Sequence, residues 1–120
     1  MRTPRPNIIL KSNSEIGQMR AAGKLVAECF AALEANIRPG VTLRELDRLA
    51  EALIEKHGAR GLYKGYPGPN GEHPPFPGVI CTSVNHEVCH GLPDERTLKE
   101  GDIVGIDLGL KYRGWCGDAC

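Results

Sequence analysis

Two aspartates near the C-terminal end have the spacing that most directly suggests chemistry. Asp107 lies in an apolar run, and Asp118 follows the turn-prone residues 112–114. Apolar residues on both sides of such a turn predict two antiparallel strands joined by a short loop. With the turn centred between Tyr112 and Arg113, the aspartates would lie directly opposite each other on one face, with Cβ atoms roughly 5 Å apart.

Two carboxylates at that separation repel each other unless a proton or a cation lies between them. A divalent metal ion, or a pair of ions bridged by carboxylates, is the usual partner when the chemistry is hydrolysis. The alternative is that both aspartates flank a turn and face water. Ile106 and Leu108 favour the metal site, because they place Asp107 in a run that is apolar enough to be buried, where an unpaired carboxylate is costly.

A second motif, His86-Glu87-Val88-Cys89-His90, matches the H-E-x-x-H pattern of zinc proteases. That pattern requires a helix, so that both histidines lie on one face. Here it lies between a strand-like run ending at Val84 and the breaker Gly91-Leu92-Pro93, which leaves too little length for a helix. We therefore interpret His86 and Glu87 as accidental and keep the zinc protease as an alternative.

His90 has a separate interpretation. It follows the end of a strand and precedes a glycine and a proline, so the sequence predicts a loop that presents its side chain. An imidazole there could hydrogen-bond a substrate carbonyl or move a proton near neutral pH. A structural role is the alternative.

Two helices are predicted upstream of these motifs. The first begins with a capping box of Ser12 and Glu15 and ends at residues 38–40, and the second begins with a box of Thr42 and Glu45 and ends at Gly58. The apolar face of the first is Ile16, Met19, Gly23, Val26, Phe30, Leu33 and Ile37, and that of the second is Leu43, Leu46, Leu49, Ala50, Leu53 and Ile54. Both faces are expected to be core.

The remaining residues predict a sheet and its connections. Residues 62–66, which include Tyr63 and Tyr66, alternate as a strand, and residues 79–84 read as a buried strand. Residues 67–78 hold eight prolines and glycines and predict a surface loop. The expected class is α+β, with two helices packed on an antiparallel sheet.

Composition excludes several classes of function. Lys and Arg (15) balance Asp and Glu (15), so no electrostatic argument favours a nucleic acid or an anionic membrane as partner. The apolar run Ile8-Ile9-Leu10 is too short for a signal sequence or a membrane span. The five cysteines are odd in number and form no C-x-x-C pair, which favours reduced thiols. We expect a soluble cytoplasmic protein.

Several of these motifs, in this order, resemble the type I methionine aminopeptidases. They are Pro39-Gly40-Val41, Glu45-Leu46-Asp47, Cys81-Thr82-Ser83-Val84-Asn85, Cys89-His90-Gly91-Leu92-Pro93, Gly101 to Asp107 and Gly114-Trp115-Cys116-Gly117-Asp118. The resemblance implies a pita-bread α+β domain made of two pseudo-symmetric halves. Residues 1–13 would be an extended arm and residues 14–120 the N-terminal half, with the C-terminal half absent.

The resemblance also implies roles for single residues. Asp107 would bind one of two divalent ions (Co, Mn, Fe or Zn) and Asp118 would bridge both. His90 would contact the substrate and assist proton transfer, while Tyr63, Tyr66 and Cys81 would line the pocket for the methionine side chain. The implied reaction is attack of a metal-bound hydroxide on the first peptide bond of a nascent polypeptide, possibly at the ribosome.

Three features depart from that family. Lys64 stands where the family has a histidine in Tyr-His-Gly-Tyr-Pro, and the loop 67–78 is longer than expected. Cys116 also stands at a common histidine position, and strand alternation would place it with Cys120 on the face of Asp118. Soft thiols beside a hard oxygen site would favour zinc or oxidation.

The chain ends two residues after Asp118, before the histidine and glutamate ligands that the resemblance implies for the second half. We therefore expect weak metal binding and little turnover by these 120 residues alone, with an exposed strand edge and uncovered apolar surface. A non-catalytic pita-bread protein that binds a polypeptide is the second alternative.

Overall fold

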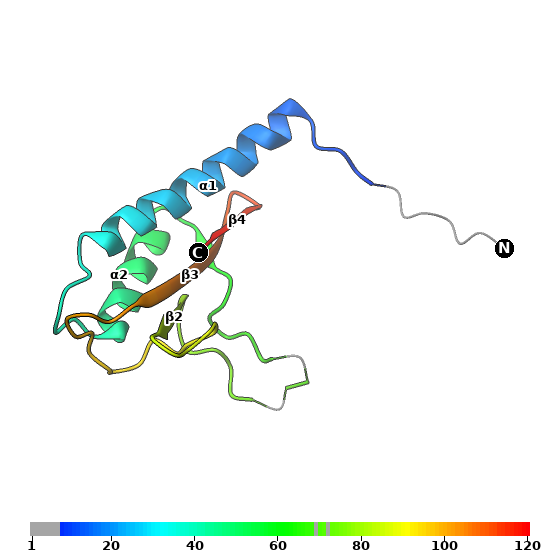
Figure 1. Cartoon of the computed structure of the whole chain (residues 1–120). Helices are drawn as coiled ribbons and strands as arrows, with labels where there is room; N and C mark the ends of the chain where they lie inside the picture. The colour runs from blue at the N-terminus through cyan, green and yellow to red at the C-terminus, as the bar shows by residue number, and fades with distance from the viewer. Residues whose placement is uncertain (1–7, 69, 72) are drawn as a thin grey trace.

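Two helices lie against one face of a four-stranded antiparallel sheet (Figure 1). This arrangement comes from a computed structural model, which describes residues 8–68, 70–71 and 73–120. The elements are α1 (Asn13–Glu34), α2 (Leu43–Lys56), β1 (Arg60–Gly61), β2 (Ile80–Val84), β3 (Val104–Tyr112) and β4 (Trp115–Ala119). The predicted α+β class is confirmed. Most of the predicted arm, residues 1–7, lies outside the described residues.

Both helices begin at the predicted capping boxes. The Ser12 hydroxyl accepts the Glu15 N–H at 3.3 Å, and the Glu15 carboxylate accepts the Ser12 N–H at 2.7 Å. The box at Thr42 has the same reciprocal bonds. α1 ends at Glu34, so the predicted extension to Ile37 is wrong. Pro39 disfavours helical backbone at the residue before it, and the chain leaves the helix through a turn.

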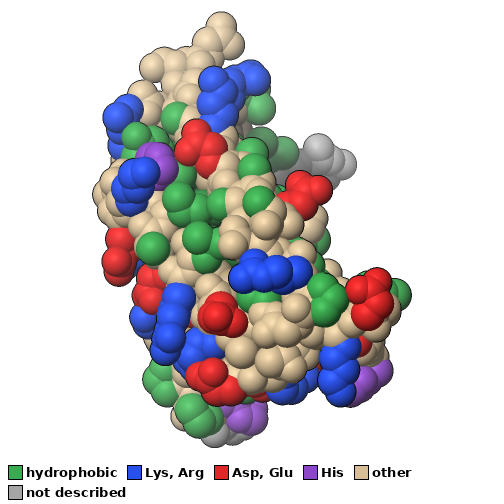
Figure 2. Space-filling view, turned by 90° about the vertical axis from the view of Figure 1, so that its left-hand side faces the viewer, with side chains coloured by type: hydrophobic (Ala, Val, Ile, Leu, Met, Phe, Trp, Pro, Cys, Tyr) green, Lys and Arg blue, Asp and Glu red, His purple; other side chains and the backbone are tan. Residues whose placement is uncertain are grey.

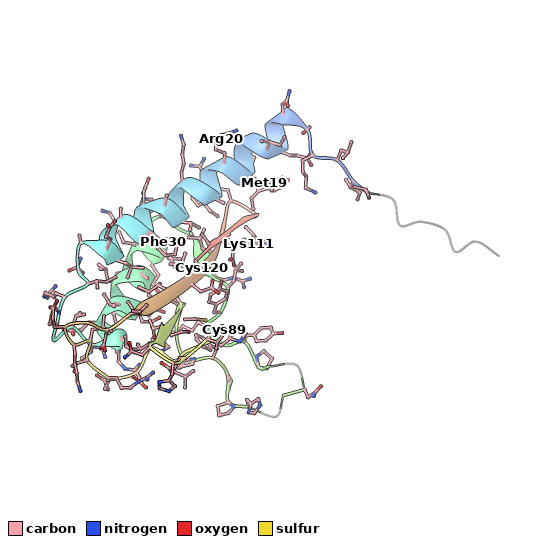
Figure 3. The ribbon with its side chains drawn as sticks, in the orientation of Figure 1. Met19, Arg20, Phe30, Cys89, Lys111 and Cys120 are labelled. Carbon is pink, nitrogen blue, oxygen red and sulfur yellow. The ribbon has the colours of Figure 1, made fainter. Side chains whose placement is uncertain are left out.

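The core face of α1 also differs from the prediction. Ile16 and Met19 are each 41% exposed, so their assignment to the core is wrong. The N-terminal turns of α1 extend past the sheet, which leaves these positions without a surface to pack on (Figures 1 and 3). The buried residues are Ala22, Leu25, Val26, Cys29 and Leu33. The predicted face of α2 is confirmed for its buried members Leu43, Leu46, Ala50 and Ile54.

β3 is the central strand of the sheet. Leu108 pairs with Ile80 of β2 on one edge and with Ala119 of β4 on the other. Leu110 likewise pairs with Gly61 of β1 and with a residue of β4. β3 therefore has hydrogen-bonded neighbours on both sides, and residues placed on it are held by the whole sheet.

The β3–β4 hairpin is confirmed, but its predicted register is wrong. The turn is Arg113-Gly114, with φ values of 50° and 86°. A two-residue turn with positive φ at both positions matches strand twist, and glycine favours the second position. This moves the turn centre by one residue, so Asp118 pairs with Gly109. Asp107 and Asp118 are diagonal neighbours on one face.

The predicted strand at residues 62–66 is also wrong. Only Arg60–Gly61 pair with β3, and the following residues form a turn in which the Tyr66 N–H donates to the Tyr63 carbonyl at 2.9 Å. Gly65 has φ 84° there, a value that a strand does not use. In the loop 67–78, the described residues contain no helix or strand, as expected.

The two faces of the sheet have different neighbours. Ile80, Leu108 and Leu110 are fully buried beneath the helices. α1 crosses β4 so closely that a Cβ on Gly117 would lie 2.9 Å from the backbone of Ala22. The opposite face carries Asp107, Gly109 and Asp118, and the helices do not cover it. That uncovered face is where the predicted site lies.

The surface agrees with the balanced composition. Basic and acidic side chains are interspersed over the face shown in Figure 2. Large exposed apolar side chains are also present among the described residues: Ile8, Ile9, Leu10, Tyr66, Val88, Leu92 and Ile103. None of the helices that the structure describes is long and apolar enough to cross a membrane.

Candidate metal centre

Asp107 of β3 and Asp118 of β4 converge on one hydroxyl group. The Tyr63 Oη lies 2.7 Å from Oδ1 of Asp107 and 2.8 Å from Oδ2 of Asp118. Tyr63 reaches them from the turn after β1. A hydroxyl carries one hydrogen and donates it to one acceptor at a time. With both carboxylates ionised, one of the two contacts would join oxygens with no hydrogen between them, an arrangement that a proton or a cation would relieve.

Gly109 makes this convergence sterically possible. A Cβ at that position would lie 2.6 Å from Oδ2 of Asp118 and 3.0 Å from the Tyr63 hydroxyl. Gly109 pairs with Asp118 across the hairpin, so the absent side chain is the space that the carboxylate and the phenol occupy. The site therefore depends on a glycine in the middle of the central strand.

Cys81 lies beside this group. It is buried on β2 and pairs with Asp107 across the β2–β3 ladder. Burial, and then the negative charge of Asp107, raises the pKa of the Cys81 thiol to about 11. Burial and the hydrogen bonds to both aspartates hold the pKa of Tyr63 far above its usual value. Both groups are protonated near neutral pH, so they present uncharged side chains to the carboxylates.

The other predicted site residues are less close together. His90 is exposed on the loop after β2, with φ 58°. Tyr66 is 59% exposed and lines a hollow of about 470 Å³ between α2 and residues 59–67. The lining of that hollow includes neither aspartate nor Cys81. The structure thus brings Tyr63, Cys81, Asp107 and Asp118 together and leaves Tyr66 outside the group.

The donor atoms fit a divalent cation in kind but not in number. Carboxylate oxygens are ligands that hard divalent ions prefer. Within the described residues, no cluster of three His, Cys, Asp or Glu side chains could hold a metal ion. Two aspartates could hold an ion only together with ligands from elsewhere.

The H-E-x-x-H alternative has no structural support. Residues 86–90 form a turn and irregular backbone rather than a helix, as the sequence predicts. Glu87 is not free to act as a base, because its carboxylate accepts the Val84 N–H and pairs with Arg96. Backbone bonding to Val84 and the ion pair with Arg96 hold the pKa of Glu87 below its usual value.

The cysteines near the site are exposed. Cys116 and Cys120 each lie two residues from Asp118, at the end of the chain that includes β4, and all three residues are exposed. Figure 3 shows Cys120 at the end of β4 and Cys89 on the loop after β2. The structure contains no third ligand that would combine with Cys116 and Cys120 among the described residues.

Comparison with protein families shows the family of the chain. Residues 17–120 match metallopeptidase family M24. The chain belongs to metallopeptidase family M24. The matched region of this M24 chain contains both aspartates, Tyr63 and the loop with His90.

Relatives of the M24 chain are methionine aminopeptidases. It is 46% identical over 112 residues to methionine aminopeptidase 1 of Bacillus subtilis and 49% identical over 113 residues to the methionine aminopeptidase of Clostridium acetobutylicum. Each match covers 93% of this chain and 42% of the relative. The chain spans less than half the length of these relatives, and it resembles their N-terminal part, as the sequence predicts.

The fold comparison gives the same result. The crystal structure of methionine aminopeptidase from Rickettsia prowazekii superposes with a TM-score of 0.84 at 40% sequence identity. The match covers 93% of this chain and 42% of the Rickettsia chain. The expected N-terminal half of a pita-bread fold is confirmed.

Sequence reasoning missed two features of the M24 chain. Tyr63 was expected only in the methionine pocket, yet its hydroxyl contacts residues 44 and 55 positions away, a separation with no local signal. Asp47 is buried, and one of its oxygens accepts the N–H groups of Val79 and Ile80. Its polar side chain among the apolar positions of α2 was the available signal.

Proposed function

We propose that the chain is the N-terminal half of a methionine aminopeptidase, which removes the N-terminal methionine from nascent polypeptides in the cytoplasm. The observation that carries this proposal is the convergence of Asp107 and Asp118 on one hydroxyl, on the face that the helices leave open. The methionine aminopeptidases that match 93% of the chain give the substrate class.

Asp107 and Asp118 would hold divalent ions. When bound, such ions supply Lewis-acid activation of water and of the scissile carbonyl. His90, on its exposed loop, would contact the substrate and move a proton. Cys81 and Tyr63 would form the wall of the methionine pocket nearest the aspartates, with Tyr66 at its rim.

The 120 residues alone would have little or no activity. Two carboxylates leave most coordination positions to water, which gives weak binding and an undefined geometry. The remaining ligands would come from residues that correspond to the part of the relatives beyond the match. The substrate partner would be the N-terminus of a nascent chain, which is accessible at the ribosome.

The test is release of methionine from a Met-Ala-Ser peptide with Mn(II), Fe(II) or Co(II). It compares the 120-residue chain with a joined chain, defined as these residues followed by the part of the Bacillus subtilis relative beyond its match. Asp118→Ala in the joined chain is the inactive control. We expect turnover only in the joined chain, with both turnover and bound metal lost in Asp118→Ala.

Two outcomes would contradict the proposal. Full activity in the 120-residue chain would mean that the site is completed by other means. A folded, metal-loaded joined chain that binds the peptide without cleaving it would favour a non-catalytic pita-bread protein.

A further inference from the structure

The loop that carries His90 closes the free edge of β2. The N–H groups of Thr82 and Val84 point away from β3 toward this loop, where the Gly91 carbonyl accepts the Thr82 N–H at 2.8 Å. The Val84 N–H donates to Oε1 of Glu87 at 2.9 Å. An unpaired N–H at a strand edge is costly when buried, so these bonds fix the loop against the strand.

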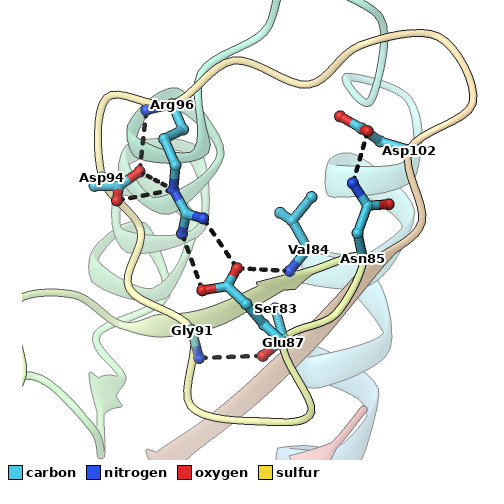
Figure 4. Close-up of polar contacts among 8 residues, drawn as sticks. All are labelled: Ser83, Val84, Asn85, Glu87, Gly91, Asp94, Arg96 and Asp102. Carbon is cyan, nitrogen blue, oxygen red and sulfur yellow. Dashed lines mark hydrogen bonds and ion pairs between the residues drawn. The ribbon is translucent and has the colours of Figure 1, made fainter.

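The loop is tied at both ends as well. Asn85 donates its N–H to the Ile103 carbonyl at 2.8 Å, and its side chain bonds Asp102 at 2.9 Å (Figure 4). The Gly91 N–H donates to the Ser83 hydroxyl at 3.1 Å. Between these ends, Glu87 supplies the tie that lies closest to His90 on its N-terminal side.

His90 needs such support because its backbone is strained. Its φ of 58° lies in the left-handed region, which a non-glycine residue keeps only when the surrounding structure holds it there. Immediately after it, Gly91 approaches β2 so closely that a Cβ would lie 2.1 Å from the Thr82 carbonyl oxygen. The histidine is therefore directed by the path of its loop and not by packing of its own exposed ring.

Arg96 connects Glu87 to the rest of the molecule. Its Nη1 and Nη2 donate to the two Glu87 oxygens at 3.1 and 3.3 Å, and its Nε donates to both oxygens of Asp94 at 2.9 Å (Figure 4). The backbone around Arg96 is bonded in turn to the start of α2, where the Leu43 N–H donates to the Arg96 carbonyl at 2.9 Å. A planar guanidinium that pairs with two carboxylates fixes their orientation as well as their charge.

We propose that Glu87 and Arg96 are positioning residues for His90. They connect the loop that presents the histidine to the N-terminus of α2, and so hold the loop in place. This inference rests on the proposed function only in taking His90 as the group that meets the substrate. It also gives Glu87 a role that the H-E-x-x-H pattern does not: the carboxylate acts on the loop and not on a metal or on water.

The test uses the joined chain with Glu87→Gln, Arg96→Met and the double variant. Glu87→Gln keeps an oxygen for the Val84 N–H while removing the charge. The matched control is Arg48→Met, which removes an exposed arginine of α2 outside the network. Two measurements are made: backbone hydrogen exchange of residues 86–91 by mass spectrometry, and kcat and KM for the Met-Ala-Ser peptide.

We expect exchange in residues 86–91 to become faster in both single variants and unchanged in Arg48→Met. In both single variants kcat should fall about tenfold, as for a catalytic group displaced by less than 1 Å, while bound metal is unchanged. KM should stay within about twofold, because the loss is in the transition state. The double variant should be no worse than either single, and Arg96→Lys should restore part of kcat.

Unchanged exchange and kcat in the single variants would overturn the inference. A lower melting temperature with unchanged kcat would show a structural role only, and would also overturn it. If the wild-type joined chain cleaves no peptide, the proposed function fails, while the exchange measurement still decides whether Glu87 and Arg96 hold the loop.

Discussion

The Tyr63 hydroxyl lies 2.7 Å from Oδ1 of Asp107, and the same hydroxyl reaches Asp118 at 2.8 Å. The phenol therefore occupies the point at which the two carboxylates come together. A cation that binds Oδ1 of Asp107 or Oδ2 of Asp118 would compete with the Tyr63 hydroxyl hydrogen for the lone pairs of that oxygen.

Tyr63→Phe should therefore tighten divalent metal binding. A hydrogen bond to a charged group contributes about 1.5 kcal/mol or more, so removing it should lower the Kd for Mn(II) roughly tenfold. Isothermal titration of the joined chain measures this, with Tyr112→Phe as the control because Tyr112 packs under Arg113 and away from the aspartates. Weaker binding in Tyr63→Phe would instead make the hydroxyl a contributor to the metal site.

Gly109→Ala should disturb the same site by placing a methyl group against Asp118 and Tyr63. Its Cβ would meet Asp118 at 2.6 Å, and overpacking of that kind costs about 1–3 kcal/mol. We expect lower thermal stability and weaker Mn(II) binding. Gly105→Ala is the matched control on β3, since the nearest contact of its Cβ is 3.8 Å away. Equal effects of the two substitutions would mean that strand propensity, not the site, is responsible.

His90→Ala should separate proton transfer from metal binding. General acid–base groups contribute about 10² to 10⁴ in rate, so kcat of the joined chain should fall by that order. Metal content, measured by atomic absorption, should be unchanged because no hydrogen bond or strand pairing in the described residues links His90 to either aspartate. A parallel loss of metal would place His90 among the ligands.

Asp47 should give the fold a specific pH dependence. Burial raises the pKa of its carboxyl, so the folded chain binds this proton more tightly than the unfolded chain does. As pH rises from the unfolded pKa of 3.8 through the raised folded pKa, this group lowers the free energy of unfolding. Asp47→Asn should remove that decline, measured by urea unfolding across this pH range.

Asp47→Ala provides the contrast. It leaves the N–H groups of Val79 and Ile80 without their shared acceptor, at a cost of about 1–3 kcal/mol for each buried group. Asp47→Asn keeps an amide oxygen in that place and should be much less destabilising. Equal losses in the two variants would show that the carboxylate charge, and not the acceptor, stabilises the start of β2.

Local signals predicted those elements that depend on local interactions. The capping boxes at Ser12 and Thr42, the α2 face and the β2 run were predicted correctly. A helix start or an apolar strand is determined by residues that are close to one another in the sequence. The absence of a helix at 86–90 followed from the breakers around it. The family was likewise recognisable from motifs that are short and contiguous.

The tertiary structure decided what depends on distant residues. The turn centre lies one residue further along than predicted because Arg113 and Gly114, both with positive φ, form the turn. The partner of Asp118 therefore moves by two residues, from Asp107 to Gly109, and the aspartates are diagonal neighbours instead of opposite. Ile16 and Met19 fit the helix period but have no sheet beneath them. The contact of Tyr63 with both aspartates arises because the turn after β1 folds over β3. The pattern of apolar residues within one segment does not indicate which distant segment it will contact.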